Sequence, residues 1–377
     1  MKFRVERDAL ADAVAWTARS LPNRPSVPVL AGVLLRVTGG TLQVSGFDYE
    51  VSTEVTVDVR GDADGAALVS GRLLAEITKA LPDKPVDIAA VGAHLELICG
   101  SARFTLPTMP VEDYPTLPEM PASAGRVDAA AFATAVQQVA VAAGRDETLP
   151  MMTGVRIELN GSTLALLATD RYRLALREME WQPDDPEVSL NALVPARTLA
   201  DTAKALGPLG GVVTLALAPG GAGEGMIGFV GGNRRTTSRL IDGSNYPPVR
   251  SLFPTTHNAQ ALVSVPALVE VVRRVALVAE RTTPVLLNFS ADGLIVEAGG
   301  TEEARASEAM EANYTGEPLT IGFNPQYLID GLQNVGANHA LLSFVDAFKP
   351  AVIAPADESG EVLPDYRYLI MPIRVTR

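Results

Sequence analysis

The sequence predicts an α+β protein of three similar domains, each with two helices packed on antiparallel sheets. Two observations lead to this prediction: long segments recur along the 377 residues, and each recurrence has the same order of helices and strands. The length also favours several domains, because one hydrophobic core stops growing beyond roughly 250–300 residues. Hydrophobic residues make up 47% of the chain and charged residues 20%, which is typical of globular proteins and excludes a disordered or fibrous class.

The clearest repeat lies in the first two thirds of the chain. PVLAGVLLRVTGGTLQVSGFD (28–48) and PMMTGVRIELNGSTLALLATD (150–170) share their first Pro, a Gly and their last Asp at a constant offset of 122 residues. LVSGRLLAEITKAL, which begins at Leu68, recurs as LVPARTLADTAKAL from Leu193. Such self-similarity indicates copies of one structural unit.

Further correspondences extend the repeat and mark where the copies join. EDYPTLPEMP (112–121) corresponds to SNYPPVRSLFP (244–254), and a fainter third copy contains PVLLNFSADGLIVEAGG (284–300) and IGFNPQYLIDGLQNV (321–335). Gly- and Pro-rich stretches near the ends of the copies are typical of joins between domains. We therefore expect domains at residues 1–122, 123–255 and 256–377.

Each copy opens with a helix, continues with strands, and has a second, shorter helix before its last strands. Apolar residues at three-to-four spacing predict the first helices at 6–20, 128–144 and 265–281, and the second helices at 71–81, 196–206 and 325–334. Asp8 and Asp128 stand near two helix starts, where a carboxylate can accept hydrogen bonds from free amides.

The stretch 150–177 differs from its counterpart in the first copy at its end. It predicts two or three strands, with a break in the apolar pattern at Thr169-Asp170. One interpretation is a plain strand connection with a solvated basic face, because Arg171, Arg173 and Arg177 share one parity. The other is a functional site, since these residues are where the second copy departs from the first.

No motif nominates a catalytic centre, a cofactor or a metal ion. The chain has no phosphate-binding G-x-x-x-x-G-K-[ST] motif, and the Gly-rich run 220–225 has no βαβ frame, which favours a hairpin loop over a dinucleotide site. The three histidines lie far apart in the sequence. The single Cys99 excludes an internal disulfide and a cysteine zinc site. An enzyme stays possible, but none of these motifs identifies its catalyst, and none predicts a cofactor.

Other features bear on location and partners. The N-terminus has no signal-peptide core, and no apolar run reaches the roughly 18 residues of a membrane helix. With one cysteine, this predicts a cytoplasmic protein without a membrane partner. The net charge of −13 argues at first sight against a nucleic-acid partner.

Five short segments, taken in order, are similar to one bacterial family. They are MKFRVERDAL at the start, NRPSVPVLAG (23–32), ATDRYRLA (168–175), the Tyr-Pro and SLFP pieces within 246–254, and YLIMPIR (368–374). Together they resemble the DNA polymerase III beta subunit, the replicative sliding clamp, in its actinobacterial form. The resemblance covers essentially the whole chain.

The resemblance implies a DNA-clamp fold in which two chains join head to tail into a ring of six domains around double-stranded DNA. Such a protein is a processivity factor with no catalytic site of its own. Its partners are the catalytic subunit of DNA polymerase III, the clamp loader and other proteins with a clamp-binding motif. The repeats suit a ring, because near-identical domains approximate sixfold symmetry.

A ring removes the conflict with the net charge. DNA that is held by topology needs only weak phosphate contacts, so a modest number of cations on the lining helices suffices. The candidates are Arg24, Arg72, Lys79, Arg145, Arg197, Lys204, Arg273 and Arg274. The preferred ones are the two repeated pairs at 72/79 and 197/204, whose spacing of seven residues puts both members on one helix face. For each cation, the competing interpretation is an ordinary solvated charge.

The family's partner pocket lies between the second and third domains and accepts a short peptide that carries Leu and Phe. The resemblance places it at Met152, Thr169, Arg171, Tyr172, Arg173, Leu174, Pro247, Leu252, Tyr327, Phe348, Leu369, Met371, Pro372 and Arg374. Apolar walls can bury two or three side chains at roughly 1.5–3 kcal/mol each before ordering costs, while Arg and Tyr supply hydrogen bonds. The competing interpretation of 369–374 is a strand that merely completes the last sheet.

The resemblance also implies an interface between the first domain of one chain and the third domain of the other. Its expected apolar residues are Phe104, Leu106, Leu277 and Val278. Arg103 is expected to pair with acids near Glu302-Glu303.

Two positions depart from the family pattern. Pro248-Val249 stands where relatives often carry an aromatic residue and a charge, and Met151-Met152 stands where a bulkier residue is common. These departures allow a divergent clamp copy with an altered pocket, for instance one that tolerates a cyclic-peptide antibiotic. The sequence also allows a peptide-binding scaffold without a DNA role, or a hydrolase that uses Asp170.

Overall fold

The structure, a computed structural model, describes residues 1–22, 24–218, 225–279, 283–299 and 304–374. The helices within these ranges are α1 (Arg7–Arg19), α2 (Gly71–Ala80), α3 (Ala129–Ala140), α4 (Ala196–Leu206), α5 (Val265–Val275) and α6 (Pro325–Gln333). Each begins within one residue of its predicted start. Three of them (α1, α2 and α6) end one residue before the predicted end, whereas α3 ends four residues early at Ala140 and α5 six residues early at Val275. A short 3-10 turn, η6 (Ala276–Val278), follows α5.

The two predicted helix caps differ. The Asp128 carboxylate accepts a hydrogen bond from the Ala131 amide at 2.8 Å, as predicted for a cap at the start of α3. Asp8 does not cap α1, because the N-cap position falls at Glu6 and Asp8 lies within the first turn. Its carboxylate instead pairs with Arg7 at 2.9 Å.

The described chain forms two compact units. Unit one contains Met1–Ala133, Trp181–Val188 and Asp201–Leu240, and unit two contains Thr134–Glu180, Ser189–Ala200 and Ile241–Arg377. The second repeat is therefore shared between the two units, and the predicted domain boundaries at 122 and 255 stay a prediction.

Unit one is built on one sheet of fourteen strands. In spatial order these are β14 (Gln182–Pro183), β10 (Ser123–Asp128), β16 (Val212–Ala218), β17 (Met226–Gly231), β18 (Arg234–Arg239), β4 (Val51–Asp58), β3 (Thr41–Phe47), β2 (Gly32–Thr38), β6 (Gly65–Ser70), β9 (Ala102–Met109), β8 (His94–Cys99), β7 (Val86–Val91), β1 (Lys2–Val5) and β5 (Arg60–Ala63). Neighbouring strands run antiparallel, as β2 and β3 do.

Unit two has two sheets. The larger has the order β15 (Ser189–Pro195), β11 (Gly154–Asn160), β12 (Thr163–Thr169), β13 (Arg173–Glu180), β27 (Tyr366–Ile370), β26 (Ala351–Ala356), β25 (His339–Phe344), β19 (Ala259–Ser264) and β23 (Asn313–Thr315). The smaller has the order β22 (Ala306–Met310), β21 (Gly293–Ala298), β20 (Val285–Ser290) and β24 (Leu319–Phe323). These strand pairs too are antiparallel, which agrees with the predicted α+β class.

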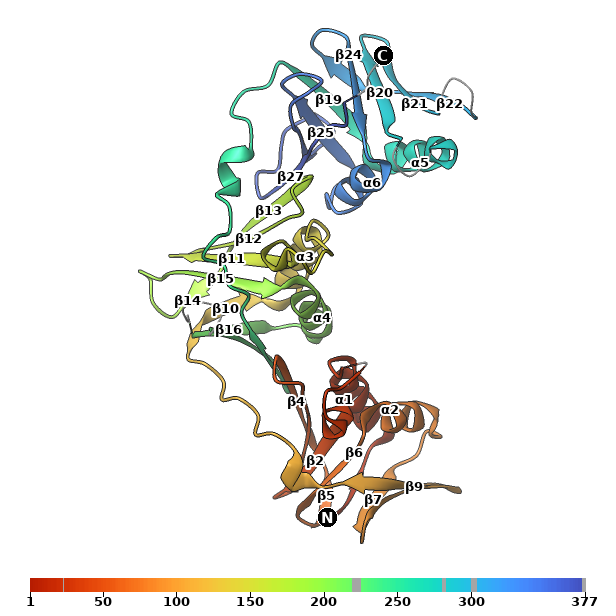
Figure 1. Cartoon of the computed structure of the whole chain (residues 1–377), viewed down its shortest axis with the longest axis vertical. Coiled ribbons are helices and arrows are strands. Elements are labelled where there is room, and N and C mark those ends of the chain that lie inside the picture. Colours follow the sequence, from red (N-terminus) through yellow and green to blue (C-terminus); the bar gives the residue numbers. More distant parts are fainter. Residues whose placement is uncertain (23, 219–224, 280–282, 300–303, 375–377) are drawn as a thin grey trace. The chain divides into compact units, whose positions relative to one another are not determined.

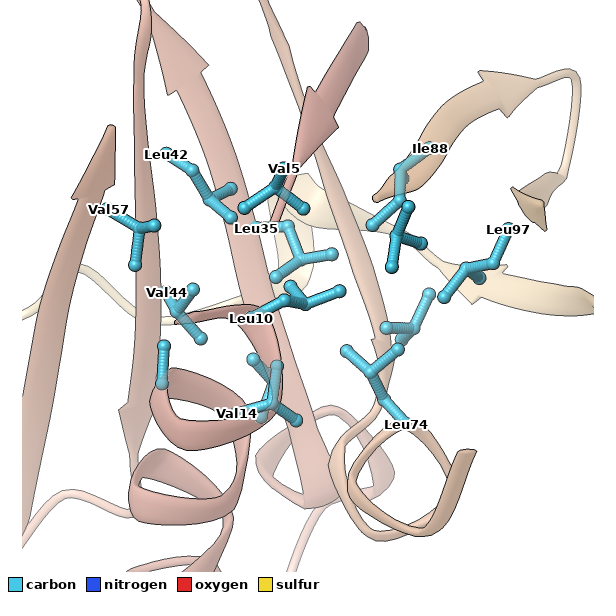
Figure 2. Packing of buried hydrophobic residues seen from close by; sticks show 14 of the residues in the cluster. Val5, Leu10, Val14, Leu35, Leu42, Val44, Val57, Leu74, Ile88 and Leu97 are labelled. Atoms are coloured by element: carbon cyan, nitrogen blue, oxygen red, sulfur yellow. The ribbon is translucent and has the colours of Figure 1, made fainter. Parts of the chain in front are cut away.

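The core of unit one explains why its helices form where they do. Leu10 and Val14 of α1 are one helical turn apart and fully buried, so they point together into the sheet. Figure 2 shows them against Leu35 and Val44, with Leu74 of α2 beside them. Figure 1 shows α1 and α2 on the same face of this sheet. The amphipathic pattern of the sequence therefore becomes a helix layer on a sheet.

Candidate functional site

A hollow of about 340 Å³ lies in unit two, where the second repeat meets the last strands of the chain. Its walls come from the 3-10 turn η3 (Pro150–Thr153), the β12–β13 connection, the 3-10 turn η5 (Val249–Leu252) and the end of β27. The lining residues are Met152, Thr169, Arg171, Arg173, Leu174, Pro247, Val249, Leu252, Pro350, Leu369 and Met371. All except Val249 and Pro350 are among the residues that the sequence predicted for one pocket.

Strand pairing brings lining residues of the second repeat next to lining residues from the last strand of the chain. In the ladder between β13 and β27, Leu174 lies opposite Leu369 although 195 residues separate them. The Met371 amide then donates to the Tyr172 carbonyl at 2.8 Å, which continues the contact beyond the strand. The last strand does complete a sheet, and its end also forms a wall of the hollow.

Five predicted pocket residues do not line the hollow. These are Tyr172, Tyr327, Phe348, Pro372 and Arg374. Tyr172 is 54% exposed, and its ring stacks on that of Tyr327 with centroids 6.4 Å apart. Phe348 is 67% exposed because it sits in a turn whose amides donate to Asp346, and Pro350 supplies the wall in its place. Pro372 and Arg374 follow β27 beyond the hollow.

Val249 and Pro350 are the lining residues that sequence reasoning missed. The Pro248-Val249 pair departed from the family pattern and gave no reason to assign it a role. In the structure Val249 is 4% exposed and packs in a core cluster with Leu174 and Leu369. An apolar residue three positions before Leu252 in a short helical turn was the available signal.

The β12–β13 connection is a tight turn that Asp170 organises. Its Oδ1 accepts hydrogen bonds from the amides of Tyr172 and Arg173 at 3.0 and 3.1 Å. Its Oδ2 accepts one from Arg173 Nε at 2.9 Å. Between them Arg171 has a φ of 78°, a left-handed conformation that is uncommon outside glycine. Both carboxylate oxygens of Asp170 are thus engaged in holding the turn.

Arg173 corrects the interpretation of a solvated basic face. Its side chain is only 7% exposed, and Nη1 donates to Asp330 Oδ2 of α6 at 2.6 Å. The guanidinium also lies 4.3 Å from the centre of the Tyr327 ring. Burial alone would lower the pKa of Arg173, but its interactions with Tyr368, Asp330 and Asp170 outweigh burial and raise it. Arg173 is therefore a permanently charged, fully paired link between β13 and α6.

The predicted DNA-facing cations occupy exposed positions. Arg72 and Lys79 lie on α2, and Arg197 and Lys204 lie on α4. Arg24 and Arg145 are exposed in connecting segments. The two cations of α5 are both paired with acids of this chain. Arg273 contacts Glu270 at 2.9 Å, and Arg274 contacts Glu308 at 2.7 Å.

The residues predicted for a subunit interface are only partly on the surface. Arg103 and Phe104 of β9 are exposed, and Leu277 in η6 is 84% exposed beside a half-buried Val278. Leu106 is a correction: it is 2% exposed, because it faces the core of unit one together with Leu95 and Leu97. The acids Glu302 and Glu303 lie outside the described residues.

Two further findings concern metal binding and membrane spanning among the described residues. No three His, Cys, Asp or Glu side chains in these ranges are placed to hold a metal ion together. No helix among them combines the length and apolar character that crossing a membrane requires.

Comparison with known proteins matches the chain from end to end. The family models for the N-terminal, central and C-terminal domains of the DNA polymerase III beta subunit match residues 1–118, 126–248 and 250–374. The chain is 53% identical to the beta sliding clamp of Streptomyces coelicolor and 43% identical to the beta sliding clamp homolog GriR of Streptomyces muensis, with 100% of both chains covered in each case.

Solved structures agree with these relatives. The sliding clamp of Pseudomonas aeruginosa bound to griselimycin has a TM-score of 0.91 at 29% identity, and that of Bacillus subtilis has 0.90 at 27%. Both comparisons cover 100% of both chains. A divergent clamp copy is not favoured, since identity to the Streptomyces coelicolor clamp exceeds identity to GriR. The chain belongs to the DNA polymerase III beta subunit family, the bacterial sliding clamps.

Proposed function

We propose that two copies of this chain form a closed ring around duplex DNA, and that the hollow of unit two holds a peptide of each partner on that ring. The hollow, with its apolar walls and its fixed charges, is the observation that carries the proposal. The catalytic subunit of DNA polymerase III, the clamp loader and other proteins with a clamp-binding motif are the proposed partners.

The chemistry of the hollow suits a peptide with two apolar anchors. Leu174, Leu369 and Met371 offer apolar walls, and Met adapts to different side chains. Arg173 is neutralised by its two acids, so the cation left at the rim is Arg171. A patch of this size supports micromolar affinity, about −8 kcal/mol. A ring with two such sites, threaded on DNA, turns this modest affinity into stable tethering.

Exposed cations on α2 and α4 support the DNA-facing role of these helices. Arg72 and Lys79 are seven residues apart on one exposed helix face, and the same spacing recurs on α4. A sliding contact requires this kind of weak phosphate interaction, with the ring supplying the retention. On α5, acids of the same chain neutralise Arg273 and Arg274.

Two incomplete strand edges support a head-to-tail dimer. In β9, residues 102–107 pair with β8, and only 108 and 109 pair with β6. In unit two, β22 is the end strand of its sheet. An uncovered edge is a template for another strand. Exposed Phe104 near one edge, and Leu277 elsewhere in unit two, supply apolar area that a second copy would bury.

The remaining aspects follow from this role. We place the protein in the cytoplasm with the DNA, and we assign it no catalytic site of its own. The solved Pseudomonas aeruginosa relative is bound to griselimycin. We propose that the hollow here also accepts a cyclic-peptide antibiotic in competition with partner peptides.

Retention on DNA tests the ring directly. The protein, loaded onto nicked circular DNA by a clamp loader with ATP, is expected to stay with the DNA through gel filtration. Cutting the circle once should release it within the time of the column, because a ring slides off an end. Equal retention on circular and linear DNA would contradict topological binding and favour an ordinary DNA-binding surface.

A further inference from the structure

Arg250 lies at the centre of the wall formed by residues 247–252. This wall contributes Pro247, Val249 and Leu252 to the hollow. Its backbone hydrogen bonds are local, for example from the Val249 amide to the Pro247 carbonyl at 2.8 Å. The wall is thus a short segment that must be held against the sheet by side chains.

The Arg250 guanidinium supplies the polar link. Nε donates to Glu158 Oε2 at 2.9 Å, and Nη1 donates to Glu178 Oε1 at 2.8 Å. Arg156 Nε donates to the other oxygen of Glu158 at 2.9 Å, so the acceptor is itself fixed. Within the described ranges, the hydrogen bonds from 247–252 to another element are these two from Arg250. We name Arg250, Glu158 and Glu178 the wall bracket.

The wall bracket spans two strands. Glu158 belongs to β11 and Glu178 to β13, so one planar guanidinium joins both strands to η5. Burial would lower the pKa of Arg250, but hydrogen bonds to Glu178 and Glu158 outweigh it, and the pKa is raised. A two-acceptor fork fixes direction as well as distance, which a single lysine ammonium cannot do.

The first repeat lacks the wall bracket. At the offsets between the repeats, Pro118 stands in place of Arg250, Arg36 in place of Glu158 and Thr56 in place of Glu178. In that copy Phe47 stands in place of Thr169 and is 8% exposed.

We propose that Arg250 is a positioning residue for peptide binding: it holds the Val249–Leu252 wall in the shape that receives an apolar anchor, without touching the peptide. This inference rests on the proposed peptide pocket. Removing the guanidinium leaves Val249 and Phe253 packed in the core, so the fold survives while the wall gains freedom. The peptide then has to order the wall on binding, which costs affinity.

The test uses the full-length protein and a synthetic peptide that carries Leu and Phe, measured by surface plasmon resonance. Arg250→Met, which keeps the aliphatic stem, is expected to weaken binding about five- to tenfold, with the change in the dissociation rate. Arg250→Lys should fall between the wild type and Arg250→Met. The matched control is Arg4→Met, since Arg4 also makes two hydrogen bonds to an acid on an exposed surface, and it should bind as the wild type does.

Two further variants separate the inference from the proposed function. Glu178→Met removes one acceptor and should weaken binding less than Arg250→Met. Met371→Asp places a charge in the hollow itself and should weaken binding at least about tenfold. When Met371→Asp is already present, Arg250→Met should reduce the peptide affinity by a smaller factor than it does in the wild-type protein, because both substitutions act on one site.

The outcomes are distinct. The positioning role is overturned if Arg250→Met and Glu178→Met both bind the peptide with wild-type affinity while Met371→Asp binds it more weakly. The proposed pocket is then unaffected. Wild-type affinity in Met371→Asp overturns the pocket and this inference with it. Faster hydrogen exchange of the amides at 249–253 in Arg250→Met, with an unchanged unfolding midpoint, supports the positioning role over a merely structural one.

Discussion

The same turn occurs in both units and serves different ends. In unit one, Asp48 Oδ1 accepts from the amides of Glu50 and Val51 at 3.0 and 2.7 Å, and Tyr49 has a φ of 75°. In unit two, Asp170 makes the equivalent bonds at 3.0 and 3.1 Å, around a φ of 78°. The two repeats therefore share this backbone, down to a left-handed residue that is not glycine.

The side chains on this common backbone differ. Phe47 stands at the position of Thr169, which lines the hollow of unit two, and the Phe47 ring lies 5.5 Å from that of Tyr49. Val51 stands at the position of Arg173, whose guanidinium pairs with Asp330 and Asp170. The comparison teaches that a few replacements on a repeated scaffold change which side chains lie beside one and the same turn.

The most direct test of this difference places a phenylalanine in unit two at the position that corresponds to Phe47. Thr169→Phe should fill the hollow and weaken binding of a Leu- and Phe-containing peptide by about 10- to 150-fold, since one excluded apolar anchor is worth roughly 1.5–3 kcal/mol. Isothermal titration calorimetry measures the change. Thr163→Phe, at the exposed start of the same strand, is the control and should bind normally. Normal binding by both variants would show that the peptide lies elsewhere.

A second test addresses the buried charge that only unit two carries at this turn. Asp330→Asn removes the carboxylate that faces Arg173 at 2.6 Å. The free energy of unfolding should fall by about 1–3 kcal/mol, because a buried guanidinium loses a charged acceptor. Urea denaturation followed by circular dichroism measures it. Asp292→Asn, in an exposed turn, should change stability by less than about 0.5 kcal/mol. Equal effects would mean that Arg173 does not depend on this pair.

The smallest expected effect is on the pH dependence of stability, and it concerns a buried tyrosine that occurs at the same position in both repeats. Burial raises the pKa of Tyr114 in unit one and of Tyr246 in unit two to about 12 in each case. An unfolded tyrosine ionises near pH 10, so the stability that each contributes is complete below about pH 10 and is lost as the pH rises towards about 12.

Tyr114→Phe and Tyr246→Phe should therefore each flatten the fall in stability between about pH 10 and pH 11, by similar amounts. Urea unfolding at these two pH values provides the measurement, and the exposed Tyr49→Phe serves as the control. A change of slope in only one buried variant would mean that the two repeats bury this tyrosine differently.

The regular parts of the fold could be predicted from the sequence. The starts of the helices followed from apolar spacing, because this signal is local. The ends of α3 and α5 did not follow, since the apolar pattern continues past the point where the helix stops. Asp8 was wrongly predicted to cap α1, because the N-cap position lies two residues earlier, at Glu6.

The site was predictable only where the family motifs identified it. The burial of Arg173 could not be inferred from its neighbours, because its partner Asp330 lies 157 residues further on. Leu106 was grouped with Phe104 because both lie on one face of β9. Leu106, however, lies opposite the buried Leu95 and is itself buried. Val249 departed from the motif and so was left out, although its burial makes it part of the wall.

The uncovered edge of β9 has a consequence for the newly made chain. Residues 102–107 offer unpaired backbone groups next to exposed Phe104, a combination that invites any extended segment to add on. We propose above that a second copy of the chain covers this edge. On that proposal a newly made subunit carries the edge uncovered until it dimerises, and we expect losses to aggregation to grow with the time that it spends as a monomer.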